Sequence, residues 1–276
     1  MLKIDAHQHF WLYTPERDTW ITEDMKVIRR NFLPEDIEPV LVKNGIDACV
    51  VVQSDQSAVE NYFQINNCLE NDFVLGVVGW VNLQADDVAE QLSYYSNFQK
   101  LKGFRHVLQG EKDRSLMLKK KFMHGISLLS KYDFSYDILI FPDQLQYAKK
   151  LAEKFPNQKF VIDHIAKPYI KNKKIDGWKQ DMEAFKKLEN VYCKVSGMVT
   201  EADWKTWKQK DFEPYLDVVT ETFGMNRLMY GSDWPVCLLS ASYKKMKGIV
   251  DTYYNSFSQD EKNAFYGGNA MAFYNL

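Results

Sequence analysis

Residues 2–10 read LKIDAHQHF, a short apolar run that ends in two histidines separated by one residue. Leu2 and Ile4 give the alternation that is typical of a strand. Side chains two residues apart on a strand project from the same face, so we expect His7 and His9 to point to one side together. The segment therefore predicts a first strand that delivers two imidazoles to a polar site.

Seven further segments share the apolar, β-branched character of this strand, and longer segments of helical character separate them. This alternation is typical of parallel βα units. The predicted strands cover residues 2–10, 48–53, 73–82, 101–107, 135–141, 159–165, 191–198 and 227–235. Eight units predict an α/β fold, a single (β/α)8 TIM barrel domain over residues 1–276. An open doubly wound sheet would alternate similarly, but the chain lacks the Gly-rich phosphate turn of that fold.

Proline, glycine and serine mark the ends of several predicted helices. Pro34 stands where a first helical turn tolerates proline, and Gly45 and Gly224 follow amphipathic segments as C-terminal stops. Ser258, with Glu261 three residues later, fits a capping box. We therefore expect an extra C-terminal helix after the eighth βα unit.

The composition excludes several classes of partner. The formal net charge is -2, and no segment has the concentration of basic residues found on nucleic-acid-binding surfaces. No run approaches the roughly 18 apolar residues of a membrane span, and the first residues lack the apolar region of a signal peptide. The 4 cysteines have no CxxC spacing and are expected to be buried, reduced thiols. We therefore expect a cytoplasmic protein with neither nucleic-acid nor membrane partners; a homodimer stays open.

Polar residues gather at the ends of the predicted strands, where a (β/α)8 barrel places its active site. They are His7, His9, Gln53, Trp80, Arg105, His106, His164, Ser196 and Asp233. The remaining histidine, His124, falls inside a predicted helix and is expected to be structural. Asp163 precedes His164, so we expect it to face the opposite side of its strand in a structural role.

His7, His9, His164 and Asp233 suit two kinds of chemistry if they meet at the barrel axis. They can hold one divalent cation such as zinc, whose bound water loses its proton near neutral pH. Without a metal, Asp233 would act directly as general base, oriented by His164, while the other histidines and Arg105 polarise a carbonyl. Both alternatives lead to hydrolysis.

Four motifs, in order, resemble the amidohydrolase superfamily, specifically its amidohydrolase-related branch of sugar-lactone and 2-pyrone-4,6-dicarboxylate lactonases. They are DAHQHFW from Asp5, VIDHIAKP from Val161, YGSDWP from Tyr230 and GGNAMAFY from Gly267. The resemblance covers essentially the whole chain. It implies a (β/α)8 barrel, hydrolytic opening of a lactone ring, and Asp233 as the base that activates water.

Carried over by position, the resemblance implies that the catalytic residues are His7, His9, His164 and Asp233. It further implies that Arg105 and His106 contact the carbonyl or the substrate. The chain has no strand-four lysine or strand-five histidine that could complete a two-metal site. The resemblance therefore implies either no required cofactor or one divalent cation such as zinc.

The expected partner is a small-molecule lactone. Trp11, Trp80 and Trp234 lie near strand ends, where aromatic faces stack on sugar rings or simply pack, and Gln53 is a further candidate contact. A dicarboxylate would need several arginines, yet only Arg105 clearly ends a strand. We therefore expect a neutral aldonolactone, and the resemblance suggests a six-deoxy sugar lactone such as L-fuconolactone or L-rhamnonolactone.

Two other functions stay open from the sequence. A nonoxidative decarboxylase of an aromatic or unsaturated carboxylic acid would need an obligatory metal and substrate-binding arginines. A non-catalytic sugar-binding barrel would leave Asp233 and the strand-end histidines without an evident purpose. The segment of residues 10–31 is expected to be either a lid or a docking surface.

Overall fold

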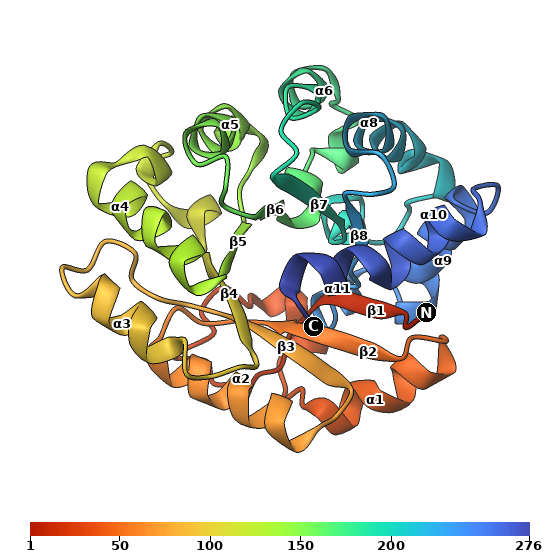
Figure 1. Cartoon of the computed structure of the whole chain (residues 1–276). Helices are drawn as coiled ribbons and strands as arrows, with labels where there is room; N and C mark the ends of the chain where they lie inside the picture. The colour runs from red at the N-terminus through yellow and green to blue at the C-terminus, as the bar shows by residue number, and fades with distance from the viewer.

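Eight parallel strands form one sheet that curves into a barrel (Figure 1). The computed structural model describes residues 1–276. Neighbours in the sheet follow chain order. The strands are β1 (Ile4–Gln8), β2 (Ala48–Val52), β3 (Val74–Gly79), β4 (Leu101–His106), β5 (Ser135–Ile138), β6 (Phe160–Ile162), β7 (Val191–Val195) and β8 (Leu228–Tyr230). This order confirms the predicted (β/α)8 barrel, because a doubly wound sheet reverses its strand order at a switch point.

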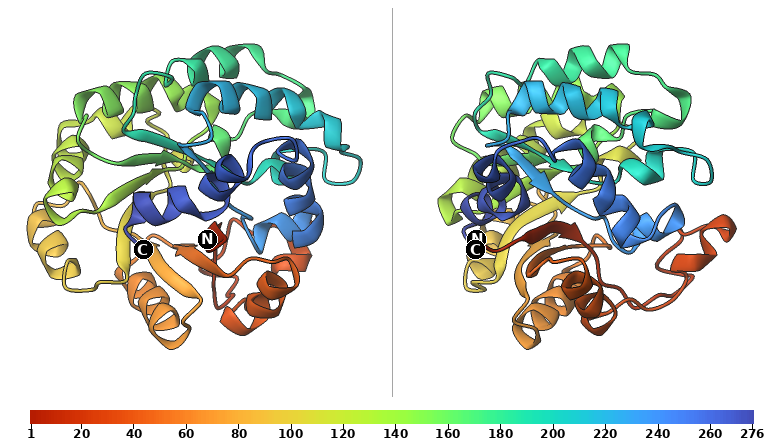
Figure 2. Two further views of the ribbon diagram at one scale, coloured as in Figure 1. Left: turned by 45° about the vertical axis from the view of Figure 1, so that its right-hand side comes forward. Right: turned by 90° about the vertical axis from the view of Figure 1, so that its right-hand side faces the viewer.

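Helices follow the strands and surround the barrel (Figures 1 and 2). The α-helices are α1 (Pro34–Lys43), α2 (Ala58–Glu70), α3 (Val88–Tyr95), α4 (Lys120–Leu129), α5 (Leu145–Lys154), α6 (Asp176–Glu183), α7 (Met198–Glu201), α8 (Glu213–Phe223), α9 (Tyr243–Tyr253), α10 (Gln259–Asn263) and α11 (Asn269–Tyr274). Pro34 begins α1, and Gly45 and Gly224 follow α1 and α8 with φ angles of +65° and +62°, as predicted. None of the helices is both long enough and apolar enough to span a bilayer.

Two apolar clusters hold the barrel together. The larger, of 67 buried residues, joins the outer faces of the strands to the surrounding helices. The smaller, of 11 buried residues, lies inside the barrel, since it joins Val50 of β2 to Val161 of β6 and Phe273 of α11. The four cysteines are buried and free, as predicted.

A β-bulge in β1 decides where the histidines point. Asp5 pairs with Cys49 and Gln8 pairs with Val51, so three steps along β1 oppose two steps along β2. Ile4 and Ala6 belong to the interior cluster, and strict alternation would therefore send the odd-numbered histidines to the outside. The extra residue resets this alternation, as bulges beside active sites do. Both histidines consequently face inward.

The barrel closes where β1 meets the residues that follow β8. The amide of Asp233 donates to the carbonyl of His7, and the amide of His9 donates to the carbonyl of Trp234, both at 2.8 Å. The buried carboxylate of Asp5 accepts from the amide of Ser232 at 2.8 Å. Backbone pairing thus places the two histidines beside Asp233.

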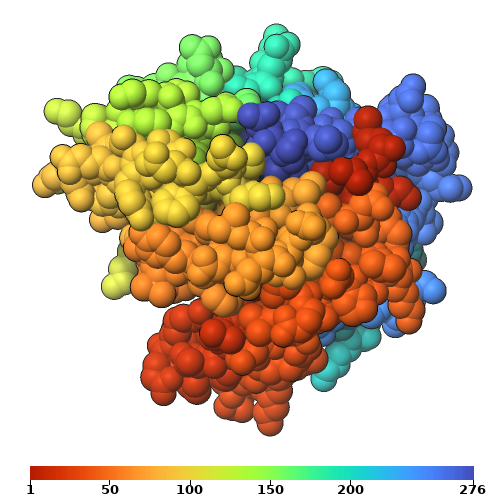
Figure 3. All heavy atoms as spheres, turned by 60° about the horizontal axis from the view of Figure 1, so that its bottom comes forward, coloured from red at the N-terminus to blue at the C-terminus, as the bar shows by residue number.

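The extra C-terminal helix exists and covers the amino-terminal end of the barrel. Ser258 and Glu261 form the predicted capping box of α10, which continues through a π-helical turn, Ala264–Gly268, into α11. Asn269 donates from Nδ2 to the carbonyl of Leu228 at 2.6 Å. The space-filling view shows the C-terminal residues against the first residues of the chain (Figure 3). The last helix is therefore part of the barrel's base.

A substitution at Gly267 tests the packing of the C-terminal segment against the first residues of the chain. A Cβ atom there would lie 2.0 Å from the carbonyl oxygen of Leu2, whereas one at Gly248 in α9 would meet nothing within 4 Å. We expect Gly267→Ala to lower the free energy of unfolding by about 1–3 kcal/mol, as overpacking does. Gly248→Ala should raise it by up to about 1 kcal/mol through helix propensity. Urea denaturation measures both, and equal shifts would mean that the C-terminal segment does not pack on Leu2.

Candidate active site

Arg105 ends β4 and is held by three elements of the barrel. Its Nη2 donates to the carbonyl of Gln53, whose Nε2 donates back to the Arg105 carbonyl at 3.1 Å. Its Nη1 lies 3.2 Å from Asp163 Oδ2 and 3.3 Å from His7 Nε2. The buried Nε–H has no partner. Arg105 is thus fixed in place with one donor unused.

Lys194 of β7 lies in the middle of the barrel and is fully buried. Its Nζ donates to Asp137 of β5, lies 3.1 Å from Asp163 Oδ1 and lies 3.2 Å from His7 Nδ1. The hydroxyl of Tyr274, from α11, donates to Asp137 at 2.8 Å. Lys194 was not among the site residues predicted from the sequence. A lysine inside an otherwise apolar predicted strand could have indicated a buried charge there.

The expectation for Asp163 was wrong, because its carboxylate faces inward like His164. The alternation of β6 ends before Asp163, and the backbone from His164 to Lys167 runs through consecutive positive φ angles of 53°, 47°, 57° and 49°. This left-handed turn aims neighbouring side chains at the same region. Burial raises the pKa of the Asp163 carboxyl, but Lys194, His7 and Arg105 together outweigh burial and hold that pKa well below its usual range.

Three charged side chains surround the ring of His7: those of Arg105, Lys194 and Asp163. Arginine can only donate, so the contact with Arg105 requires a lone pair on Nε2 of His7. The ring proton is then on Nδ1, 3.2 Å from Asp163 Oδ1, and Lys194 Nζ, which lies 3.2 Å from the same nitrogen, is left to Asp137 and Asp163 as its acceptors. Burial lowers the pKa of His7 well below its usual value. His7 is therefore a neutral ring that lies behind the cavity described below.

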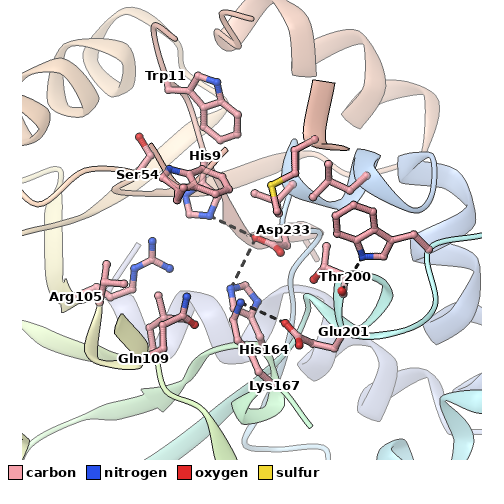
Figure 4. A pocket seen from close by; sticks show the side chains of 17 residues that line it. His9, Trp11, Ser54, Arg105, Gln109, His164, Lys167, Thr200, Glu201 and Asp233 are labelled. Atoms are coloured by element: carbon pink, nitrogen blue, oxygen red, sulfur yellow. Dashed lines mark hydrogen bonds and ion pairs between the residues drawn. The ribbon is translucent and has the colours of Figure 1, made fainter. Parts of the chain in front are cut away.

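Asp233 lies between two imidazoles at the carboxyl end of the barrel (Figure 4). His9 Nδ1 lies 2.7 Å from the carbonyl of Val52, which can only accept, so this nitrogen carries a proton and Nε2 faces Asp233 Oδ1 at 3.4 Å. His164 Nε2 lies 3.8 Å from the same oxygen. Asp233 itself has a positive φ of 57°, which directs its side chain away from the line of β8.

His164 is fixed from behind by β7 and the residue after it. Its Nδ1 lies 2.8 Å from the hydroxyl of Ser196, and a Cβ at Gly197 would come within 2.6 Å of that nitrogen. Burial lowers the pKa of His164 well below its usual value. The ring facing Asp233 is therefore neutral.

A cavity of about 360 Å³ opens beside Asp233. One part of its lining is apolar and the other carries polar and charged groups. The lining residues are His9, Trp11, Trp20, Met25, Ser54, Arg105, Val107, Gln109, Leu139, His164, Lys167, Thr200, Glu201, Trp204, Asp233, Val236 and Leu239. This size is at the lower end of the range for small-molecule sites.

The segment of residues 10–31 forms a wall of this cavity. Trp11 pairs with Phe32 through two backbone hydrogen bonds of 2.9 Å, and its ring contacts that of Trp20 at 5.9 Å between centroids. Trp20 and Met25 complete the contribution of this segment to the lining. The segment therefore shapes the site.

Four of the predicted substrate contacts lie outside the lining: Gln53, Trp80, His106 and Trp234. Gln53 holds Arg105, as described above, and His106 contacts Glu111 at 2.7 Å. The predicted contacts Arg105 and Trp11 do line the cavity. His124 is exposed on α4.

The sequence analysis also missed polar residues that line the cavity. They are Ser54, Gln109, Lys167, Thr200 and Glu201. Each follows a predicted strand, in a loop or a short helical turn whose path no periodicity describes.

Three side chains of the site could supply ligand atoms to one divalent cation, and the fourth predicted ligand is not grouped with them. Ligand atoms of His7, His164 and Asp233 lie within 4.8 Å of one another, and imidazole nitrogen with carboxylate oxygen is a zinc donor set. His9, the fourth predicted ligand, is not in that group but also faces Asp233. Arg105 competes for His7, because it already donates to Nε2. His164 and Asp233 are therefore more available than His7 as ligands of a cation.

Comparisons with known proteins agree with the resemblance of the motifs. A family model for amidohydrolases matches residues 4–276. An L-fucono-1,5-lactonase from Burkholderia multivorans is 35% identical, with 100% of this chain and 96% of that protein covered. An L-rhamnono-gamma-lactonase from Scheffersomyces stipitis is 27% identical, with 66% of this chain and 61% of that protein covered. A crystal structure of an amidohydrolase from Burkholderia multivorans with bound zinc has a TM-score of 0.96 at 35% identity, with 100% of both chains covered.

Lys194→Met tests the interior charge cluster. The variant leaves Asp137 and Asp163 without their shared ammonium, and breaking a buried pair costs about 3–5 kcal/mol. Burial raises the pKa of Asp137 from 3.8 to about 6 even with Lys194 present. The wild type therefore loses stability as the pH rises from about 4 to about 6, because its folded state holds this proton more tightly than the unfolded chain does. Lys194 lowers the pKa of Asp137, so that pKa is higher still in the variant, and the additional loss of stability in the variant should grow as the pH rises above about 6.

Chemical denaturation at pH 5 and pH 8 measures this loss. Lys121→Met is the control, since its ion pair with Asp86 is exposed and such pairs contribute about 0–1 kcal/mol. A Lys194→Met variant as stable as the control at both pH values would contradict the assignment.

Proposed function

This chain belongs to the amidohydrolase family, and we propose that it hydrolyses a sugar lactone, opening the cyclic ester of an aldonolactone to the sugar acid. The observation that carries the proposal is Asp233, a carboxylate set between the imidazoles of His9 and His164 and lining the same cavity as Arg105. The names of the relatives, an L-fucono-1,5-lactonase and an L-rhamnono-gamma-lactonase, support the class of substrate.

Asp233 is the general base in this proposal. A water beside its carboxylate attacks the lactone carbonyl carbon and gives a proton to Asp233, which accounts for general-base catalysis of about 10²–10⁴-fold. With its ring proton on Nδ1, His9 can accept a hydrogen bond from the water at Nε2, and Nε2 of His164 lies beside the same oxygen of Asp233. A neutral His164 suits this role, because a permanent imidazolium would pair with Asp233 and weaken the base.

Arg105 is the electrophilic group. Its unpaired Nε–H can donate to the carbonyl oxygen, which gains negative charge as the tetrahedral intermediate forms. The other guanidinium donors are already bound to Gln53, Asp163 and His7, so the group needs no reorganisation during the reaction. His7 and Gln53 act here by positioning Arg105.

Ring opening completes the reaction. The intermediate collapses, the bond between the carbonyl carbon and the ring oxygen breaks, and the ring oxygen takes the proton that Asp233 accepted. The product is a hydroxy acid, and the carboxylate of Asp233 is restored. Because Asp233 returns to the ring oxygen the proton that it took from water, this step needs no further acid.

The cavity favours a monosaccharide lactone. Its volume of about 360 Å³ fits one small ring, and Trp11 offers an aromatic face. We propose a neutral six-deoxy aldonolactone such as L-fuconolactone or L-rhamnonolactone as substrate. Trp80, Trp234 and His106 lie outside the lining and are proposed to support the loops around it.

A single divalent cation is an accessory to the site in this proposal. His164 and Asp233 would hold it, with His7 as the contested third ligand. When bound, such an ion supplies Lewis-acid polarisation and a more acidic water. The charge on Arg105 already provides polarisation from the chain itself, so we propose that hydrolysis does not require the ion.

A decarboxylase fits the site less well. An aromatic acid would need an unpaired cation for its carboxylate, whereas Lys167 is paired with Glu201 and the guanidinium of Arg105 is paired with Asp163. A purely sugar-binding barrel gives no role to a base and an electrophile in one cavity.

Asp233→Asn should lower kcat on an aldono-1,5-lactone by about 10²–10⁴-fold, since the amide cannot accept the proton of water. The shape of the site is kept, so calorimetry should detect lactone binding by the variant. A pH-indicator assay measures acid release, with His124→Asn as the control because His124 is exposed on α4. Undiminished turnover by Asp233→Asn would exclude Asp233 as the base.

A further inference from the structure

Three polar residues of the cavity have no part in the mechanism above. Lys167 follows β6, and Glu201 ends α7; Lys167 Nζ lies 3.4 Å from Glu201 Oε1 (Figure 4). Gln109 comes from the loop after β4. All three line the same cavity as Asp233. Their polar groups therefore face whatever is held beside the base.

The pair formed by Lys167 and Glu201 is shielded from bulk water, with side chains 17% and 20% exposed. The left-handed turn after β6 includes Lys167 itself, at a φ of 49°, and thus directs it toward the cavity. Strained backbone of this kind is found at functional sites. The pair has no part in closing the barrel, because backbone hydrogen bonds between β1 and the residues after β8 do so.

Gln109 gives an independent sign of a missing ligand. Its side-chain oxygen, Oε1, is buried and has no hydrogen-bond partner. Its backbone is fixed, because its amide donates to the carbonyl of Leu139 at 3.0 Å. Buried polar atoms are nearly always paired, so this acceptor calls for a donor from a bound molecule.

We propose that Lys167, Glu201 and Gln109 form a hydroxyl-binding subsite that selects polyhydroxylated, uncharged lactones. The carboxylate of Glu201 and the amide oxygen of Gln109 accept from ring hydroxyls, and the ammonium of Lys167 donates to a hydroxyl oxygen. Charge-assisted hydrogen bonds of this kind are the strong ones. The inference rests on the proposed lactone hydrolysis and adds which part of the substrate is recognised.

The subsite also argues against anionic lactones. A carboxylate on the ring would meet the carboxylate of Glu201, while the charge of Lys167 is already compensated by that same partner. The other part of the lining, which includes Trp20, Met25 and Leu239, is apolar and suits the C–H face or a methyl group of the ring. The cavity thus has one hydroxyl-binding part and one apolar part.

The test compares two substrates of the purified full chain: L-fucono-1,5-lactone, which carries ring hydroxyls, and δ-valerolactone, which carries none. Glu201→Gln should raise KM for the hydroxylated lactone about 10-fold or more, the size of one lost charge-assisted hydrogen bond, and Gln109→Leu should raise it about 2- to 10-fold, the size of one lost neutral hydrogen bond. Their kcat/KM for δ-valerolactone should stay within about 3-fold of wild type. Glu183→Gln is the matched control, because its pair with Lys179 is exposed on α6.

The outcomes separate the two proposals. Selective loss on the hydroxylated lactone by either variant supports the subsite, since a structural defect would lower both activities together. Equal losses on both substrates, or no loss on either, would overturn the subsite and leave the lactonase proposal standing. Wild-type protein that hydrolyses neither lactone would overturn the proposed function, and the subsite with it.

Discussion

The closure of the barrel between β1 and the loop after β8 is the constraint on which the site depends. Two backbone hydrogen bonds join His7 to Asp233 and His9 to Trp234, so the base and the imidazoles are neighbours before any side-chain contact forms. The bulge in β1 then turns both rings inward. A positive φ at Asp233 turns its carboxylate toward them. Irregular backbone at two places thus builds the site from a regular barrel.

Inside the barrel, a buried set of charges supports this arrangement. Lys194 and Arg105 carry two positive charges; Asp163 accepts a hydrogen bond from Arg105 and forms an ion pair with Lys194. Asp137 accepts from Lys194 and from Tyr274, which belongs to the C-terminal helix. Buried ions are tolerated only when they are paired and hydrogen-bonded. The pairing explains why the last helix reaches into the barrel and why Arg105 keeps a single free donor.

The sequence predicted the parts of this structure that follow from periodicity and strand ends. All eight strands, the C-terminal helix and the positions of His9, His164 and Asp233 at one cavity follow from the rule that barrel sites form at the carboxyl ends of strands. His7 was expected to share a face with His9 and does, but that face is the interior of the barrel because of a bulge that no pattern reveals.

The sequence did not predict the parts of the site that lie where the backbone departs from regular strand or helix periodicity, or that depend on contacts between distant segments. Asp163 was placed on the wrong side because the left-handed turn begins directly after it. Lys194 was missed because an isolated lysine in an apolar strand gives no hint of its partners in other strands. Lys167 follows β6 and Glu201 ends the short helix α7, and only the fold brings them together. Pairings between distant loops are set by packing, which a single sequence does not encode in its spacing.

The most direct measurement is acid release from L-fucono-1,5-lactone by the purified protein, in a pH-indicator assay with and without a strong chelator. The account predicts turnover that persists after chelation, because Asp233 and Arg105 supply the base and the electrophile from the chain itself. No turnover on any neutral aldonolactone, or turnover only of an aromatic acid with added metal, would contradict it and favour a metal-dependent decarboxylase.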